Sequence, residues 1–146
     1  MIRASLRRMA ADREVIEAAD APPAIGPYSH AVRFGGLLIC SGQIPLDPQT
    51  GEIVGSTAAE QARRCMESLA AVCHAAGASL DDALRLTIYM TDLAEFASVN
   101  EVYGSFFGSR PPARVTVGVA ALPRGAYVEI DAIVAAPEPS EAGSAP

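Results

Sequence analysis

An arginine near the start of an apolar segment is the first feature of this sequence that could do chemistry. Residues 112–120, PARVTVGVA, are typical of a buried strand, yet they include Arg114. A partly buried guanidinium needs an anion, which is supplied either by the protein or by a ligand. Two carboxylates, Glu129 and Asp131, follow in the next apolar segment, YVEIDAI. The alternatives are a structural ion pair and a site that binds an acidic ligand.

The two-residue period of a strand predicts which of these side chains share a face. Arg114 and Thr116 alternate with valines, while Glu129 and Asp131 alternate with Val128 and further aliphatic residues. If the aliphatic sides of both strands form the core, the other side carries one arginine, one hydroxyl and two carboxylates. We therefore expect these four polar side chains on the same face of the sheet.

Composition limits the classes of function. The chain has 146 residues, of which 50% are hydrophobic and 19% charged, as expected for one globular domain. Its net charge of -6 and pI of about 4.8 disfavour a nucleic-acid partner, because such binding depends on phosphate neutralisation. Two histidines without a ligand cluster indicate no metal site. No apolar run approaches the roughly 18 residues that a membrane-spanning helix needs.

Cysteine usage and the N-terminal residues bear on the compartment. Cys40, Cys65 and Cys73 are odd in number and form no CxxC pair, which favours buried thiols in a reducing, cytoplasmic setting. Residues 1–11 contain three arginines and no acid. They read either as a short mitochondrial transit peptide or as an irregular N-terminus, and their shortness favours the second reading.

The remaining pattern predicts strands first and then alternating helices and strands. A capping box at Thr57 and Glu60 and a terminal Gly77 delimit the first helix. The second helix is expected at 93–107, after Asp92. The expected strands cover residues 13–18, 31–34, 37–41, 83–91, 114–120 and 127–135. We expect a flexible extension at 1–12, a domain at 13–135 and a disordered tail at 136–146.

The order of these elements predicts an α+β fold with a single mixed sheet and both helices packed on one face. The strands are apolar on both sides, and no further element remains to cover the second face. Self-association would cover it, so we expect a homo-oligomer with sites between subunits.

Five ordered blocks of the sequence resemble the RidA (YjgF-type) family of enamine/imine deaminases. They are AIGPYSHAV from Ala24, ICSGQIPLDPQTGEIV from Ile39, DLAEFASVNEVYGSFF from Asp92, PPARVTV from Pro111 and LPRGAYVEIDAIVA from Leu122. The resemblance spans roughly residues 21–135. It implies a chorismate-mutase-like fold and a homotrimer whose sheets form a central barrel, with ligand clefts between subunits.

The resemblance also implies roles for particular residues. Arg114 corresponds to the arginine that clamps a substrate carboxylate, and Glu129 to the glutamate beside a reactive water. The expected substrate contacts are Tyr28, Ser41, Gly42, Asn100 and Thr116. Many members have cysteine at the position of Thr116, so that a thiol is absent here. His30 is expected at the rim of the site.

The function that follows is hydrolytic deamination of 2-aminoacrylate-type enamine/imine intermediates to 2-oxo acids and ammonia, as in a 2-iminobutanoate/2-iminopropanoate deaminase. The resemblance implies no metal and no organic cofactor. One alternative is a non-catalytic module that binds small 2-oxo acids. A third reading is an endoribonuclease, an activity also attached to this family.

Overall fold

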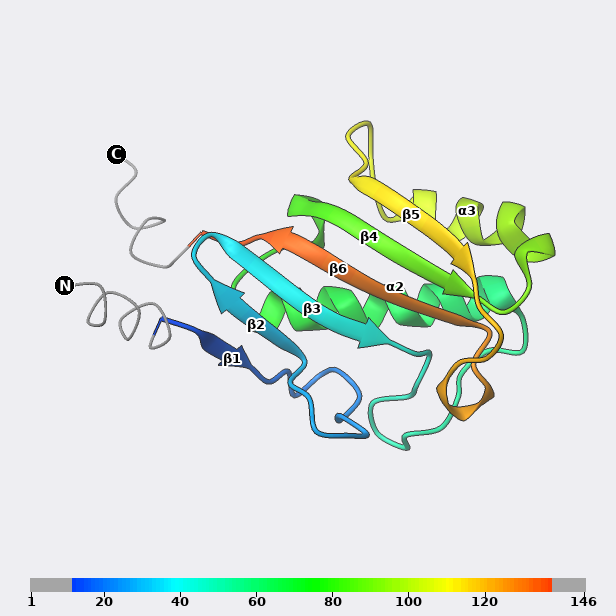
Figure 1. Ribbon diagram of the computed structural model, residues 1–146, viewed down its shortest axis with the longest axis horizontal. Coiled ribbons are helices and arrows are strands. Elements are labelled where there is room, and N and C mark those ends of the chain that lie inside the picture. The colour runs from blue at the N-terminus through cyan, green and yellow to red at the C-terminus, as the bar shows by residue number, and fades with distance from the viewer. Residues whose placement is uncertain (1–11, 138–146) are drawn as a thin grey trace.

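A six-stranded mixed sheet forms the centre of the computed structural model, which describes residues 12–137 (Figure 1). The strand order is β1-β2-β3-β6-β4-β5, and only β4 and β5 run parallel. The bounds are β1 Glu14–Ile16, β2 Ala31–Phe34, β3 Leu37–Gln43, β4 Ala83–Met90, β5 Ala113–Gly118 and β6 Val128–Ala135. This arrangement confirms the predicted α+β class and single mixed sheet.

Helix α2, Ala58–Ala75, begins and ends at the predicted signals. The Thr57 side chain accepts a hydrogen bond from the backbone N–H of Glu60 at 3.2 Å. The Glu60 carboxylate accepts in turn from the backbone of Ser56, one residue earlier than in a standard capping box. At the other end Gly77 has a φ of 71°, and Ala78 donates its backbone N–H to the Cys73 carbonyl, which closes a Schellman motif.

The second helical segment is divided in two. Asp92 accepts a hydrogen bond from the backbone of Ala94 and so caps a short 3-10 turn, η2, at Leu93–Glu95. Helix α3, Phe96–Ser105, then continues from that turn. The expected single helix at 93–107 is therefore shorter, because the cap tightens its first turn instead of opening an α-helix directly.

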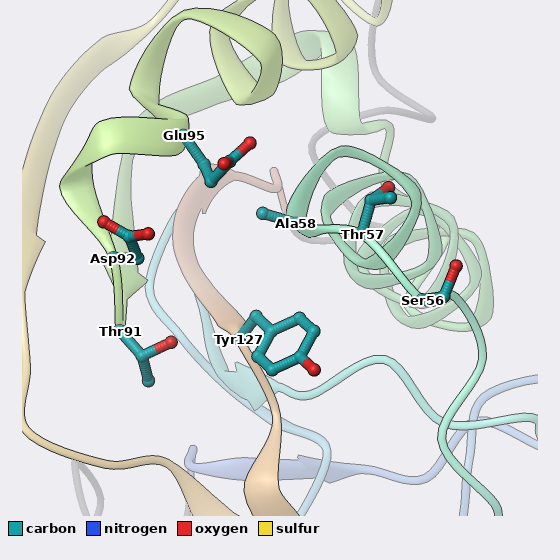
Figure 2. Close-up of a pocket in the computed structure, with 7 residues that line it drawn as sticks. All are labelled: Ser56, Thr57, Ala58, Thr91, Asp92, Glu95 and Tyr127. Carbon is teal, nitrogen blue, oxygen red and sulfur yellow. The ribbon is translucent and has the colours of Figure 1, made fainter.

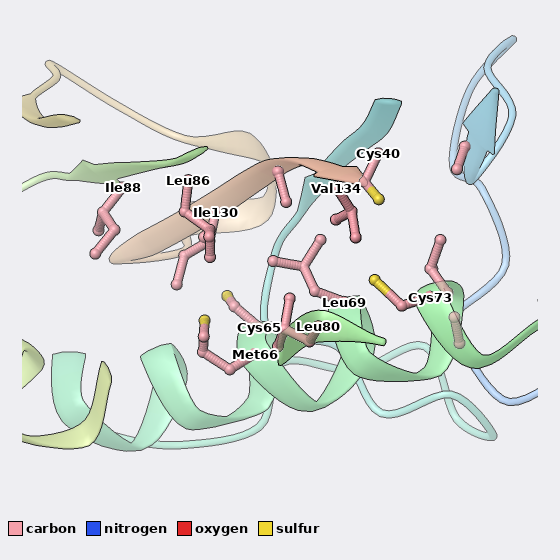
Figure 3. Close-up of a cluster of buried hydrophobic side chains, with 14 of the residues drawn as sticks. Cys40, Cys65, Met66, Leu69, Cys73, Leu80, Leu86, Ile88, Ile130 and Val134 are labelled. Carbon is pink, nitrogen blue, oxygen red and sulfur yellow. The ribbon is translucent and has the colours of Figure 1, made fainter. Parts of the chain in front are cut away.

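The hydrophobic core lies between α2 and one face of the sheet (Figure 3). Leu69 and Met66 of α2 pack against Leu86 and Ile88 of β4 and against Ile130 of β6. All five side chains are fully buried. All three cysteines are buried in this layer, as expected for small apolar side chains. Burial raises the pKa of the Cys65 thiol well above its ordinary value, which suits a structural role.

Both helices cover the same face of the sheet, as Figure 1 shows, and no described element covers the other face. We call this second surface the open face. It carries apolar side chains that are between 37% and 52% exposed: Val15, Phe34, Leu37, Ile39, Val115 and Val117. Large apolar side chains exposed in such number on one face are typical of an interface.

The boundary predictions fall mostly outside the described residues. The expected extension at 1–12 is described only at Asp12, and the expected tail only at Ala136 and Pro137. Ala136 is buried and donates its backbone N–H to Gly36 at 2.8 Å, so the packed domain includes it. Within residues 12–137, none of the helices has the length and apolar character needed to cross a bilayer.

Truncation of a core side chain gives a direct check of this packing. Leu69→Ala removes a fully buried side chain and should lower the free energy of unfolding by about 2–5 kcal/mol. Leu93→Ala is the matched control, because Leu93 is 50% exposed, and it should change stability by less than about 1 kcal/mol. Urea denaturation at one fixed protein concentration measures both. Equal losses for the two variants would contradict the assigned core.

Candidate functional site

Four of the predicted site residues line one hollow on the open face. Tyr28, Ser41, Gly42 and Glu129 surround a cavity of about 320 Å³ together with Ile25, Ile44 and Pro123. We call it the glutamate hollow. Its volume is at the lower end of the range for small-molecule sites, which suits a ligand of a few heavy atoms.

Glu129 is held against the backbone of β3 where that strand is irregular. The β3–β6 register shifts between Cys40 and Gln43, and Gly42 lies in that irregular stretch. A Cβ atom at Gly42 would lie only 2.6 Å from Oε1 of Glu129. Glycine is therefore needed at position 42 so that the carboxylate can lie flat over the backbone.

The electrostatic surroundings of Glu129 favour its protonated form. Burial, and to a lesser degree the negative charge of Asp131, raise the pKa of the Glu129 carboxyl above its ordinary value. A carboxyl whose pKa moves toward neutrality exchanges protons more readily at physiological pH. This hollow therefore contains a group suited to general acid–base work.

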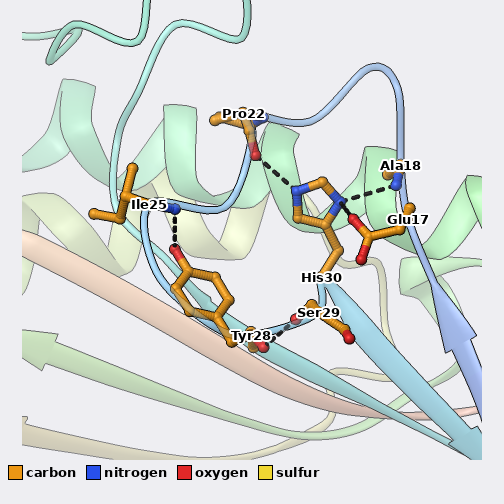
Figure 4. A network of polar contacts seen from close by, with 8 residues as sticks. Glu17, Ala18, Pro22, Ile25, Tyr28, Ser29 and His30 are labelled. Atoms are coloured by element: carbon orange, nitrogen blue, oxygen red, sulfur yellow. Dashed lines mark hydrogen bonds and ion pairs between the residues drawn. The ribbon is translucent and has the colours of Figure 1, made fainter.

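A short polar network fixes the wall of the glutamate hollow (Figure 4). The Tyr28 hydroxyl accepts a hydrogen bond from the backbone of Ile25 at 3.1 Å. The Ser41 hydroxyl donates to the Ser29 carbonyl at 2.6 Å, so its proton is already used within the protein. Of these two side chains, Tyr28 is the more available to a ligand, because 42% of it is exposed.

The expectation that His30 lies at the rim is wrong. His30 is buried, its Nδ1 accepts from the backbone of Ala18 at 2.8 Å, and its Nε2 lies 2.7 Å from the Pro22 carbonyl. Both ring nitrogens are therefore used to hold the loop that carries Tyr28, as Figure 4 shows. The role of this histidine is structural.

The other predicted residues gather at β5 and α3, where Arg114 lies on aromatic rings. Its guanidinium carbon is 5.5 Å from the centroid of Phe96 and 4.9 Å from the centroid of Tyr103. Stacking of this kind contributes about 0.5–2 kcal/mol and leaves the N–H edges of the guanidinium available. None of the ion pairs within residues 12–137 involves Arg114, which excludes a structural salt bridge there.

Unpaired polar atoms accompany this arginine. Phe96, Asn100 and Tyr103 follow one another at helical spacing and so share one face of α3. Asn100 Oδ1, the Tyr103 hydroxyl and Thr116 Oγ1 are buried without a hydrogen-bond partner in the described part of the chain. We call these four residues, together with Arg114, the arginine cluster. Buried unpaired polar atoms are costly and are common at functional sites.

The glutamate hollow and the arginine cluster lie on opposite faces of the sheet. Arg114 pairs with the buried Leu86 of β4 and faces the helices, whereas Glu129 pairs with Tyr89 and faces away from them. The predicted single polar face is therefore wrong. Alternation within each strand was read correctly, but β4 separates β5 from β6, and the registers place Arg114 on the same side as Val128.

A second hollow, of about 320 Å³, lies between the start of α2 and η2 (Figure 2). It contains none of the predicted site residues, and its charged side chains are the carboxylates of Asp92 and Glu95. These charges would repel an acidic ligand, so this hollow does not compete for the same chemistry. Within residues 12–137, no cluster of three metal-binding side chains is present.

Two residues of the arginine cluster were missed by the sequence reasoning. Phe96 and Tyr103 are aromatic residues at helical spacing, which usually pack in a core, and Tyr103 is indeed buried. The available signal was the polar Asn100 between them on the same helix face. A helix that points an amide and two rings in one direction can support a cation.

The chain is similar to known proteins along most of its length. The family pattern described as Endoribonuclease L-PSP matches residues 18–136. Protein DfrA of Myxococcus xanthus is 55% identical over 130 residues, which is 88% of this chain and 98% of that protein. The human 2-iminobutanoate/2-iminopropanoate deaminase is 40% identical over 121 residues, 83% of this chain and 88% of that one.

A solved structure has the same fold. The crystal structure of Escherichia coli TdcF with bound serine superposes with a TM-score of 0.79 at 43% identity and covers 84% of this chain and 98% of that chain.

The packing of Glu129 on Gly42 predicts the effect of one added methyl group. Gly42→Ala should displace the Glu129 carboxylate, because the new Cβ would overlap Oε1. A crystal structure of the variant should show a different Glu129 side-chain position, because the end of a flexible, partly exposed side chain can move away from the new Cβ. Gly36→Ala is the control, since nothing lies within 4 Å of a Cβ there. An unmoved Glu129 in Gly42→Ala would refute the packing argument.

Proposed function

The chain belongs to the endoribonuclease L-PSP family, the RidA (YjgF-type) family that its sequence resembles, and on this premise we propose that it deaminates reactive 2-imino acids. The reaction is hydrolysis of a C=N bond. A 2-imino acid, formed from its enamine tautomer, takes up one water and gives a 2-oxo acid and ammonia. Relatives named 2-iminobutanoate/2-iminopropanoate deaminase support this substrate class.

The observation that carries the proposal is the guanidinium of Arg114, which stacks on two rings and has no carboxylate partner in the described structure. A planar guanidinium binds a carboxylate through two parallel hydrogen bonds. Small 2-imino and 2-oxo acids present such a carboxylate next to the reacting carbon. The serine in the E. coli TdcF crystal, a small amine with a carboxylate, is consistent with this preference.

Glu129 would handle the protons of the reaction. Its raised pKa suits a group that accepts a proton from the attacking water and later returns it to the leaving nitrogen. Tyr28, Ser41 and Gly42 would shape the ligand site around it, while Asn100 and Thr116 would contact the ligand beside Arg114.

Water is the nucleophile that this chain supports. The printed sequence contains no lysine, so no lysine amine can form a Schiff base with the substrate. Thr116 replaces the cysteine of many relatives, so that thiol is also absent. Imines of this kind also hydrolyse without help, so a modest enhancement of the rate would suffice.

Two copies of the chain are needed to complete the site. The sheet separates Arg114 from Glu129 within one chain, so both can reach one small ligand only if a second copy brings its glutamate hollow to the first copy's arginine cluster. We infer a homotrimer in which the apolar open faces meet around a central barrel and three equivalent sites lie between subunits.

Loss of the arginine should remove the activity. In a coupled assay a serine or threonine dehydratase generates the imine, and the rate of 2-oxo acid release is compared with that in buffer. Arg114→Ala should reduce the enhancement at least about 100-fold, because the carboxylate loses a charge-assisted bidentate contact. Arg63→Ala, at an exposed arginine of α2 that also stacks on an aromatic ring, is the matched control and should retain the activity.

Calorimetry and an RNA-cleavage assay, run beside the coupled assay, separate the alternative functions. Tight calorimetric binding of 2-oxobutyrate without turnover would favour a binding module. Cleavage of RNA by the pure protein, lost in Arg114→Ala, would favour the ribonuclease reading. Full deaminase activity in Arg114→Ala would contradict the proposed role of the guanidinium.

Mixing two inactive variants tests the shared site. Arg114→Ala and Glu129→Gln should each be inactive as homotrimers. Co-expressed in equal amounts, they should recover about one quarter of the wild-type activity, because random assembly places an intact arginine beside an intact glutamate in about a quarter of the sites. Mixed trimers, verified by mass spectrometry, that show no recovery would mean that both residues act from the same chain.

A further inference from the structure

A hydrogen-bonded pair on the open face lies next to Glu129 and has no part in the function proposed so far. The register of β4 and β6 places Tyr89 opposite Glu129 and Thr87 opposite Asp131. The hydroxyl of Tyr89 reaches diagonally across the two strands and donates to Oδ2 of Asp131 at 3.0 Å. The three side chains of Tyr89, Asp131 and Glu129 therefore form one cluster on two adjacent strands.

We propose that Asp131, held in place by Tyr89, is a positioning residue that controls the protonation of Glu129. The proposal rests on the function assigned to Glu129 above and adds a regulator of that same site. Asp131 stands two residues from Glu129 on the same face of β6, so that their Cα atoms are about 7 Å apart along the strand. Between two partly buried carboxyl groups on one strand face, one negative charge opposes the appearance of another.

Tyr89 matters because it fixes where this charge lies. A free aspartate side chain would rotate away from a second carboxylate, which would weaken the repulsion. The hydrogen bond from Tyr89 holds Asp131 on the sheet, and its effect is mutual, since burial and the bond to Asp131 raise the pKa of the Tyr89 hydroxyl. The phenol thus remains a donor throughout the neutral range.

None of the other described groups around Glu129 carries a positive charge that would offset the negative charge of Asp131. From β3 the backbone at Gly42 and the Ser41 hydroxyl face it, and the loops contribute Tyr28 and Pro123. Through the sheet lies the thiol of Cys65, which remains protonated because burial raises its pKa. Within residues 12–137 no arginine forms an ion pair with Glu129 or Asp131. Within one chain, the charge of Asp131 is therefore the main electrostatic influence on Glu129 besides burial.

The test measures Glu129 directly, by carbon-detected NMR titration of labelled glutamate carboxyls in the assembled protein, with Glu129→Gln to assign the signal. In Asp131→Asn the midpoint of the Glu129 titration should move to lower pH, because the amide keeps the size and the acceptor of Asp131 but loses its charge. Tyr89→Phe should move it in the same direction by less. Glu67→Gln removes a charge from the exposed side of α2 and should leave the midpoint unchanged.

The pH profile of the deaminase gives the second readout. On its acidic limb kcat/KM of Asp131→Asn should rise roughly threefold over wild type, since more Glu129 is then ionised. An unmoved Glu129 midpoint in Asp131→Asn would overturn the inference whether or not the protein is a deaminase. A moved midpoint in a protein without deaminase activity would preserve the electrostatic coupling and reject the proposed function instead.

Discussion

The arrangement of this protein depends on a guanidinium that is partly removed from water yet has no carboxylate partner in the described structure. Phe96 and Tyr103 support Arg114 through their ring faces, so its hydrogen-bonding edges stay unused. A structural ion pair would have satisfied the charge and closed the site. Aromatic support instead fixes the side chain while leaving its affinity for an external carboxylate.

The sheet determines which of the two key side chains lies on which face. It places Arg114 on the helical side and Glu129 on the open face, where Gly42 leaves room for the carboxylate. Arg114 and Glu129 of one chain therefore cannot reach the same small ligand, and the proposed site needs a second copy. Apolar residues of the open face, such as Ile39 and Val115, are exposed in one chain, and association with further copies would bury them. The proposed assembly and the proposed catalysis both follow from this placement of the two residues.

The sequence predicted most of the fold because its signals are local. Thr57 and Gly77 delimit α2 by hydrogen bonds within a few residues, and Gly35 sits at the hairpin turn with a φ of 59°. The faces of Arg114 and Glu129 were predicted wrongly because alternation gives relative sides within one strand only. The register across β4 is a tertiary property. Likewise nothing local distinguishes Tyr103, which supports a cation, from an ordinary core aromatic residue.

The most direct measurement is a crystal structure of the assembled protein with 2-oxobutyrate bound. The account predicts the ligand carboxylate in two parallel hydrogen bonds to Arg114 of one subunit, and the carbonyl carbon facing Glu129 of the partner subunit. A ligand carboxylate bound away from Arg114, or a site built from a single chain, would contradict it.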